Sequence, residues 1–212
     1  MKSIDHCYFI NLDKRTDRKE HTLKVVMPFF SFKEGLFTRY SAIDTSAQPT
    51  LSLRSVGCAQ SHLNIYKDAK SKGYKRILIL EDDFVPIIEK EELLLRWNFF
   101  IKNYSDFNVC QFSYNDVRKA KAVDQSGLVL ESNNVQTTSA YAIRVSFCDK
   151  IIPKIEKSIN LLKKGYDPNL HAIDQSWKSF QSLDNKWYLL KRCGRQACDF
   201  SDLEKRVVNY GL

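Results

Sequence analysis

Apolar positions along the chain gather into short continuous runs that alternate with longer amphipathic stretches. The clearest run, Ile77-Leu78-Ile79-Leu80, has no polar interruption, as expected of a strand that is covered on both faces of a sheet. The run Cys7-Tyr8-Phe9-Ile10 has the same character. Short strands that alternate with amphipathic helices are typical of an α/β fold. We therefore predict one α/β domain that spans residues 1–212.

The same patterns place the other elements. Pro153 predicts a kink or a later start in a helix expected over 146–163, and the weak periodicity of 192–212 predicts a loop with a short helix. Gly57 and Gly73 mark the expected ends of a helix over 57–72. The remaining helices are expected over about 17–27, 89–104 and 173–180, and the strands over 7–10, 37–41, 76–80, 109–114, 127–131, 138–144 and 187–190.

The chain carries a formal net charge of +8 at pH 7, which favours anionic partners such as a nucleotide diphosphate, an acidic membrane surface or nucleic acid. Its basic residues are dispersed and are not interleaved with aromatic residues in one segment, which argues against nucleic acid. A solvated lysine-rich surface is the simplest alternative explanation of the charge.

The six cysteines are scattered and form no CxxC pair, so we expect reduced thiols rather than disulfides or a zinc site. The N-terminus lacks the apolar core of a signal peptide. No apolar stretch reaches the roughly 18 residues of a membrane span. These features predict a cytoplasmic location.

An acidic tripeptide, Glu81-Asp82-Asp83, follows directly after the apolar run that ends at Leu80. In open α/β sheets, ligands bind outside the carboxyl ends of strands. Three adjacent carboxylates repel one another, and a hard divalent cation such as Mn²⁺ or Mg²⁺ would compensate them. The alternative is an exposed acidic turn, but the apolar residues on both sides of the tripeptide favour the metal site.

Four segments carry similarity to a known family, in that family's order. They read FINLDKRTDR at 9–18, GCAQSH at 57–62, ILEDDF at 79–84 and AIDQSW at 172–177. Two weaker echoes are TSAYAI at 138–143 and Gln196 followed by Phe200-Ser201-Asp202. With these motifs the chain resembles glycosyltransferase family 25, which includes bacterial lipooligosaccharide galactosyltransferases and collagen hydroxylysine galactosyltransferases.

The resemblance implies a GT-A-type fold, a Rossmann-like nucleotide-sugar-binding sandwich with a mixed central sheet flanked by helices. It implies a UDP-sugar donor, most often UDP-galactose and alternatively UDP-glucose, with Mn²⁺ or Mg²⁺ and with inversion at the anomeric carbon. The implied acceptor is a hydroxyl of a glycan, as in lipopolysaccharide biosynthesis, or of a hydroxylated protein. The chain lacks the second transferase domain and retention signal of the animal collagen enzymes, which favours a bacterial or viral type of relative.

The acidic tripeptide is the expected centre of this site. Asp83 is the expected direct metal ligand, and Glu81 is a second candidate ligand. Glu81 and Asp82 are expected to touch the ribose or the water shell of the metal. The role of the cluster is better defined than the role of each carboxylate.

Two further groups are expected to bind the nucleotide. Asn11, Arg15 and Arg18 follow the first strand, where guanidinium groups suit a diphosphate, although we expect at least one of these arginines to be structural. Ser61 and His62 are expected in the first turns of a helix that follows Gly57, where a helix N-terminus favours anions. A buried structural histidine is the alternative for His62.

Asp174 is the candidate general base that takes the proton of the acceptor hydroxyl. The family often has Pro-Val where this chain has Ala172-Ile173, and the alternative is that Asp174 caps a short helix. His171 is an alternative metal ligand. Tyr141 and Trp177 are either sugar-stacking residues or, as is commoner for aromatic side chains, core residues.

Two other functions compete with an inverting hexosyltransferase. The first is a catalytically inactive relative that binds a nucleotide or a glycan, and the presence of Asp83 and Asp174 argues against it. The second is a metal-dependent nucleotidyl or phosphoryl transferase. That function predicts a glycine-rich phosphate-binding loop, which the sequence does not contain.

Overall fold

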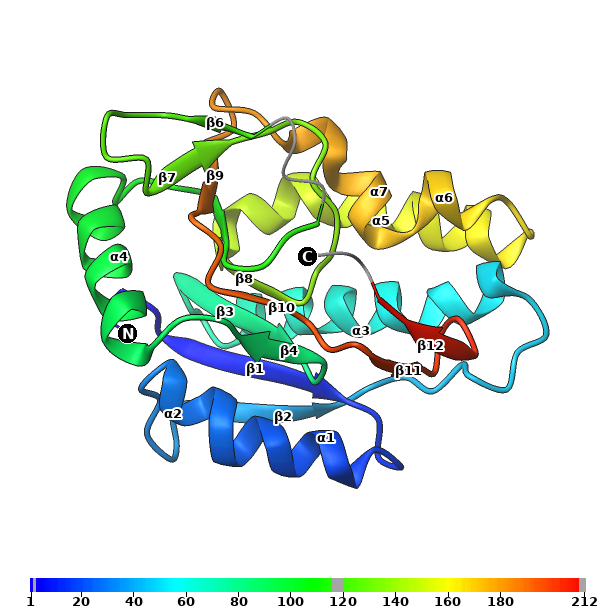
Figure 1. The fold of residues 1–212 in the computed structure, drawn as a ribbon. Helices are drawn as coiled ribbons and strands as arrows, with labels where there is room; N and C mark the ends of the chain where they lie inside the picture. Colours follow the sequence, from blue (N-terminus) through cyan, green and yellow to red (C-terminus); the bar gives the residue numbers. More distant parts are fainter. Residues whose placement is uncertain (2, 116–119, 210–212) are drawn as a thin grey trace.

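The computed structural model describes residues 1, 3–115 and 120–209, and within them the chain forms an eight-stranded sheet with helices on both faces (Figure 1). The strands are β1 (His6–Asn11), β2 (Phe37–Ser41), β3 (Arg76–Glu81), β5 (Val109–Gln111), β6 (Lys121–Ala122), β7 (Val129–Glu131), β8 (Ala140–Arg144) and β9 (Trp187–Leu190). Their order is β2-β1-β3-β8-β5-β9-β7-β6. β2, β1 and β3 are parallel, whereas β8 is antiparallel to both β3 and β5. The predicted mixed α/β sheet is therefore confirmed.

The two faces of the central strand β3 bury different side chains. Ile77 and Ile79 pack with α3 (Leu51–Ser71) and α5 (Cys148–Lys163), and Leu78 and Leu80 pack on the other face with α4 (Lys90–Asn103). All four side chains are fully buried. Each such burial stabilises the fold by about 1.5–3 kcal/mol. Helices on both faces explain why this strand is apolar without interruption.

Most expected helices are present, with changed ends. The first is divided into α1 (Thr16–His21), a π-helical turn η1 (Thr22–Val26) and α2 (Met27–Phe29). α5 follows a 3₁₀ turn, η3 (Val145–Phe147), begins two residues later than expected and continues through Pro153. The helix expected over 173–180 consists of α7 (Ile173–Ser176) and the 3₁₀ turn η4 (Trp177–Phe180), and it is preceded by the short α6 (Pro168–His171).

The start of α3 differs from the prediction. The helix begins at Leu51, six residues before Gly57, and the Thr50 side chain caps it by accepting a hydrogen bond from the Leu53 N–H. Gly57 lies inside the helix because the chain after β2 crosses it closely there. A Cβ at Gly57 would overlap Thr45 Oγ1 and the carbonyl oxygen of Ile43.

The C-terminal region also differs from the prediction. Within the described residues, which end at 209, the chain has no helix after η4, so the expected short helix is wrong up to that point; residues 210–212 lie outside the described residues. Three short strands are present instead. β10 (Gly194–Gln196) pairs with β4 (Phe84–Pro86), and β11 (Asp199–Ser201) pairs with β12 (Arg206–Val208). Strands of three residues are too short to give a periodic sequence pattern.

The cysteines and the helices bear on two further expectations. All six cysteines are free thiols, as expected from their scattered positions. None of the helices in the described part of the chain combines the length and the apolar character that a bilayer crossing requires.

Candidate active site

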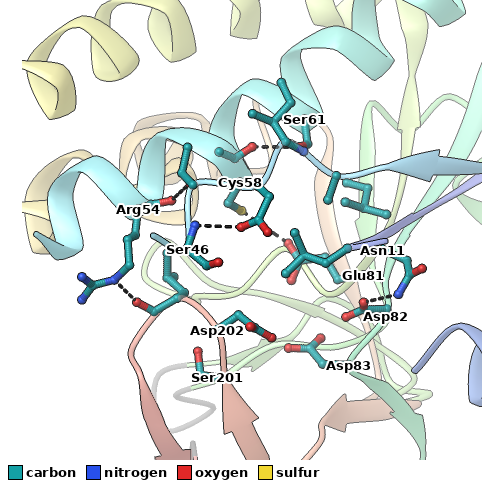
Figure 2. A pocket seen from close by; sticks show the side chains of 18 of the residues that line it. Asn11, Ser46, Arg54, Cys58, Ser61, Glu81, Asp82, Asp83, Ser201 and Asp202 are labelled. Carbon is teal, nitrogen blue, oxygen red and sulfur yellow. Dashed lines mark hydrogen bonds between the residues drawn. The ribbon is translucent and has the colours of Figure 1, made fainter. Parts of the chain in front are cut away.

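The carboxyl ends of β1 and β3 lie at the same edge of the sheet because these strands are adjacent and parallel. Ile10 is opposite Glu81 in the register, so Asn11 and residues 81–83 meet there. A cleft with about 810 Å³ of empty space opens at this edge (Figure 2). Its walls are the loops after β1 and β2, the first half of α3 and residues 196 and 201–203.

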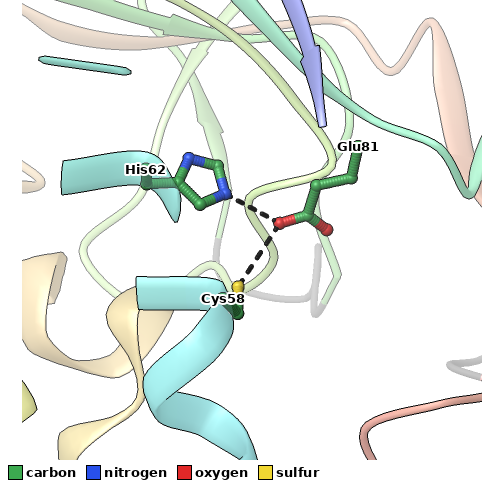
Figure 3. Close-up of side chains that lie close together, drawn as sticks. All are labelled: Cys58, His62 and Glu81. Atoms are coloured by element: carbon green, nitrogen blue, oxygen red, sulfur yellow. Dashed lines mark hydrogen bonds and ion pairs between the residues drawn. The ribbon is translucent and has the colours of Figure 1, made fainter. Parts of the chain in front are cut away.

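Glu81 is held by hydrogen bonds from three residues, of which the two on α3 are drawn in Figure 3. Its Oε1 accepts from His62 Nε2 at 2.9 Å, from Thr138 Oγ1 at 2.5 Å and from the Cys58 thiol at 3.7 Å. Burial alone would raise the pKa of Glu81. The hydrogen bond and charge of His62 and the hydrogen bond from Thr138 outweigh the effect of burial, so the pKa lies below its ordinary value. Glu81 is therefore an ionised carboxylate with a fixed orientation.

A chain of buried hydrogen bonds leads from Glu81 into the core. An ionised carboxylate only accepts, so His62 donates through Nε2, and its Nδ1 lies 2.7 Å from the Tyr141 hydroxyl. The Tyr141 hydroxyl in turn lies 2.6 Å from the Tyr66 hydroxyl. His62 is fully buried, and its hydrogen bond fixes the position of the Glu81 carboxylate. This arrangement fits the alternative of a buried structural histidine.

The expected position of Ser61 and His62 at a helix N-terminus is wrong, because α3 begins at Leu51, ten residues before Ser61. The Ser61 hydroxyl donates to the Gly57 carbonyl at 2.7 Å and accepts from the Ile43 N–H at 3.0 Å. Ser61 therefore holds the loop after β2 against α3. The helix-dipole argument for anion binding by these two residues does not apply.

Cys58, His62 and Glu81 place one ligand atom each within 4.8 Å of one another, as in a metal site. The bonding favours a hydrogen-bonded cluster instead. Burial, followed by the charges of Glu81 and other nearby carboxylates, raises the pKa of Cys58 well above its ordinary value, so its sulfur stays protonated. Both ring nitrogens of His62 are already bonded within the protein.

Asp82 uses both carboxylate oxygens within the protein. Asn11 Nδ2 donates to Oδ2 at 2.7 Å, and Arg18 Nη1 lies 3.1 Å from Oδ1. Arg39 Nε donates to Asn11 Oδ1 at 2.8 Å and so fixes the amide in turn. Asn11 and Asp82 therefore build the floor of the cleft and orient Arg18, which also lines it.

Asp83 differs from its neighbours because one of its oxygens has no partner. Oδ2 accepts from Gln196 Nε2 at 3.1 Å, and Oδ1 is buried without a hydrogen bond to any residue that the structure describes. Burial, followed by the charges of Glu81 and Asp82, raises the pKa of Asp83 to about 7. A buried acceptor without a donor is costly unless something else satisfies it. The hard oxygen of Asp83, beside two further carboxylates, suits Mn²⁺ or Mg²⁺.

The two candidate arginines differ in surroundings. Arg15 does not line the cleft, and its guanidinium is paired with Asp17, Asp199 and Asp202 at 2.8–3.0 Å. Arg15 is thus structural, as expected for at least one of the pair. Arg18 lines the cleft beside Asp82, and its buried Nε has no hydrogen-bond partner.

Asp174 lies outside the residues that line the cleft but close enough to Glu81 for their charges to interact. Its Oδ2 accepts from the Thr137 N–H at 3.2 Å, and burial raises its pKa above the ordinary value. Ala172, not Asp174, occupies the N-cap position of α7, so the capping alternative is wrong. His171 is outside the cleft lining and packs edge-on against the Tyr166 ring at 5.9 Å between centroids.

Tyr141 and Trp177 are core residues, the commoner of their two expected roles. Both are fully buried, and their rings pack at right angles with centroids 5.1 Å apart. A fully buried ring has no face to offer a sugar.

Several residues of the cleft were not predicted. Arg54 and residues 42–46 give no sequence signal, because the helix was expected to begin later and the loop has no motif. Gln196, Ser201 and Asp202 belong to the weaker C-terminal echo and line the cleft as well. Gln196 reaches the cleft because β10 pairs with β4, which places Gln196 opposite Phe84 and therefore beside Asp83.

Comparison with known proteins gives the family. The sequence model of glycosyltransferase family 25, described as an LPS biosynthesis protein, matches residues 4–177. No curated protein matches the chain.

Similar solved structures include a glycosyltransferase involved in glycosylation of the major capsid of PBCV-1, with 9% identity, a TM-score of 0.56 and coverage of 94% of this chain and 95% of that one. The glycosyltransferase GlyE of Streptococcus pneumoniae TIGR4 has 11% identity, a TM-score of 0.47 and coverage of 90% and 46%. At this identity the first likeness shows the fold, which is of the GT-A type. Since the family model covers most of its length, the chain belongs to glycosyltransferase family 25.

Proposed function

We propose that this glycosyltransferase moves a hexose from a UDP-sugar to a hydroxyl group with inversion at the anomeric carbon. The observation that carries the proposal is the buried Oδ1 of Asp83, which has no partner at the floor of a cleft. Galactose is the proposed sugar and glucose the alternative, on the basis of the family resemblance. The proposed acceptor is a glycan or a hydroxylated protein side chain, and the membrane surface that carries a lipid-linked glycan fits the net charge of +8.

The charges of the cleft indicate how an anionic donor is held. Among the described residues, its lining has five carboxylates and two guanidinium groups: Asp44, Glu81, Asp82, Asp83 and Asp202 against Arg18 and Arg54. A diphosphate needs further positive charge to enter such a site. A Mn²⁺ or Mg²⁺ held by Asp83, with Glu81 as the second proposed ligand, would supply that charge and act as a Lewis acid toward the leaving diphosphate.

The protein groups perform the remaining steps. Arg18 binds the diphosphate and is oriented for this by Asp82. The chain from Tyr141 through His62 keeps the Glu81 carboxylate in one orientation, so no reorganisation is needed during transfer.

Asp174 is the proposed general base. Its carboxylate takes the proton of the acceptor hydroxyl while the acceptor oxygen bonds to the anomeric carbon. The bond from that carbon to the phosphate oxygen breaks, and the electron pair leaves with UDP. The Thr137 N–H holds one oxygen of Asp174, which leaves the other for the acceptor.

UDP release from a panel of UDP-sugars, with and without Mn²⁺, tests the proposal. Asp83→Ala should lower the rate by about a hundredfold or more, because it removes charge stabilisation of the leaving group. Asp174→Asn should lower transfer to an acceptor by about 10²–10⁴ while UDP binding is retained. Asp149→Ala, which removes an exposed carboxylate on α5, is the matched control.

Two results would contradict the proposal. Equal rates for the wild-type protein and Asp83→Ala would remove the metal assignment. Binding of UDP by the wild-type protein without turnover of any UDP-sugar would favour the catalytically inactive relative.

A further inference from the structure

The β11–β12 hairpin forms one wall of the cleft without belonging to the main sheet (Figure 1). Within the described part of the chain its strands pair only with each other, and its turn supplies Asp202 and Leu203 to the cleft lining, beside Ser201 at the end of β11. The hairpin lies beyond residues 4–177, the part of the chain that the family model matches.

Apolar packing contributes little to this attachment. In the described chain, no side chain of residues 199–208 belongs to either hydrophobic core cluster. Phe200 and Val207 are opposite each other in the hairpin and are 42% and 68% exposed. Among the described residues, Val208 at the end of β12 is the only buried apolar side chain of the hairpin, so apolar burial fixes it to the domain at one end only.

Cationic side chains from the N-terminal part of the chain hold the hairpin instead. The Asp199 Oδ2 atom lies 2.8 Å from Arg15 Nη2 and 3.3 Å from Arg18 Nη2. Arg18 Nη2 also donates to the Phe200 carbonyl at 2.9 Å. One carboxylate thus bridges two guanidinium groups at the edge of the cleft.

The turn of the hairpin is held in the same way. The two oxygens of Asp202 lie 3.2 Å from Lys14 Nζ and 3.0 Å from Arg15 Nη1. Arg54 Nε donates to the Leu203 carbonyl at 2.6 Å. Figure 2 shows Asp202 and Arg54 on this side of the cleft, with the Arg54 bond drawn.

One of these cations, Arg18, is in position to bind a diphosphate in the cleft. Arg18 lines the cleft, and Arg15 and Lys14 belong to the same loop and helix start. A guanidinium edge that is bonded to a carboxylate is not free to bind a phosphate in the same geometry. Asp199 of the hairpin and the phosphates of a donor therefore compete for Arg18.

We propose that Asp199 and Asp202 form an exchangeable anionic latch, in which a diphosphate displaces Asp199 from Arg18 and loosens the β11–β12 hairpin. The inference rests on the proposed function only for the identity of the natural ligand, a nucleoside diphosphate sugar. When no diphosphate is bound, the latch holds this wall of the cleft in place. The entering diphosphate replaces an internal ion pair, so the cations are never left unpaired.

Hydrogen–deuterium exchange of residues 199–208, measured with inorganic pyrophosphate and with UDP, tests the latch. Either ligand should increase exchange in the hairpin. Asp199→Asn should raise exchange without ligand and should tighten pyrophosphate binding by about threefold to tenfold, because it removes a competing anion. Glu156→Gln is the matched control, because it removes an exposed ion pair between α5 and Lys67 of α3. It should change neither the exchange of the hairpin nor the affinity for pyrophosphate.

The outcomes separate the latch from the proposed enzyme. Pyrophosphate that loosens the hairpin of a protein that turns over no UDP-sugar supports the latch and contradicts the enzyme. UDP-sugar turnover with unchanged hairpin exchange and with equal affinity in Asp199→Asn overturns the latch alone. The latch is also overturned if neither ligand changes hairpin exchange and Asp199→Asn changes neither hairpin exchange nor pyrophosphate affinity.

Discussion

The close crossing of α3 by the loop after β2 makes Gly57 a sensitive position. In an ordinary helix interior, Gly→Ala stabilises by about 0.8–1 kcal/mol because alanine has the higher helix propensity. Here the added Cβ would overlap Thr45 Oγ1 and the Ile43 carbonyl oxygen, and overpacking of this kind costs about 1–3 kcal/mol. Since the carbonyl belongs to the backbone and cannot rotate away, we take the upper part of that range. The net destabilisation expected for Gly57→Ala is therefore about 1–2 kcal/mol.

The functional effect should be specific to donor binding. The displaced residues 43–45 line the cleft, whereas Asp83 is on a different element, so KM for the donor should rise while kcat changes little. For a chain of this size, the melting temperature should fall by about 2–8 °C. Thermal denaturation and donor-dependent kinetics measure the two effects.

A matched control separates general destabilisation from loop displacement. Gly165 has φ +83° and open space around its Cβ position, so Gly165→Ala is strained by about 1–2 kcal/mol without any clash. It should lower stability by a similar amount and leave KM unchanged. Adding Thr45→Ala to Gly57→Ala should restore part of the stability, because it removes one of the two overlaps. Wild-type stability and KM in Gly57→Ala would refute the reasoning.

Two other predictions concern buried and charged hydrogen bonds. Tyr141→Phe removes the hydroxyl that His62 and Tyr66 share, so it should lower the free energy of unfolding in denaturant by about 1–3 kcal/mol. The control Tyr40→Phe removes a half-buried hydroxyl bonded to Asn64 and should cost less than about 1 kcal/mol. Equal losses in the two variants would contradict the role of the buried hydrogen-bond chain. The hydrogen bond and charge of Arg15 lower the pKa of Asp17 to about 2, so the ionised form stabilises the fold above the ordinary pKa of 3.8 and this stabilisation is lost as pH falls through about 2. Asp17→Asn should therefore lose less stability than the wild type between pH 4 and pH 2, and parallel pH profiles would contradict this assignment.

The central strands and the acidic tripeptide were predictable because their sequence signals are local. An uninterrupted apolar run at residues 77–80 requires cover on both faces, and the carboxylates that follow it must lie at the sheet edge. The start of α3 was not predictable, because Gly57 lies inside the helix for a tertiary reason, the approach of residues 43–45. A glycine alone does not distinguish a helix end from a close crossing.

The candidate site was predictable in part for a similar reason. Asp83 was found because it directly follows its strand, but Arg54, Gln196 and Asp202 reach the cleft from distant segments. Two of the three carboxylate partners of Arg15 are likewise invisible in the sequence, since Asp199 and Asp202 are brought to it by a hairpin of two three-residue strands. Short elements held by ion pairs leave no periodic pattern.

The hydrogen bonds that run from Tyr66 through Tyr141 and His62 to Glu81 join α3, β8 and β3. Replacing any single member leaves a buried donor or acceptor stranded, whereas a coordinated exchange for apolar groups of matching shape is tolerated. In related sequences, these four positions should therefore be retained together or replaced together. An engineer who wishes to retune the acid at the end of β3 should redesign all of them in one step.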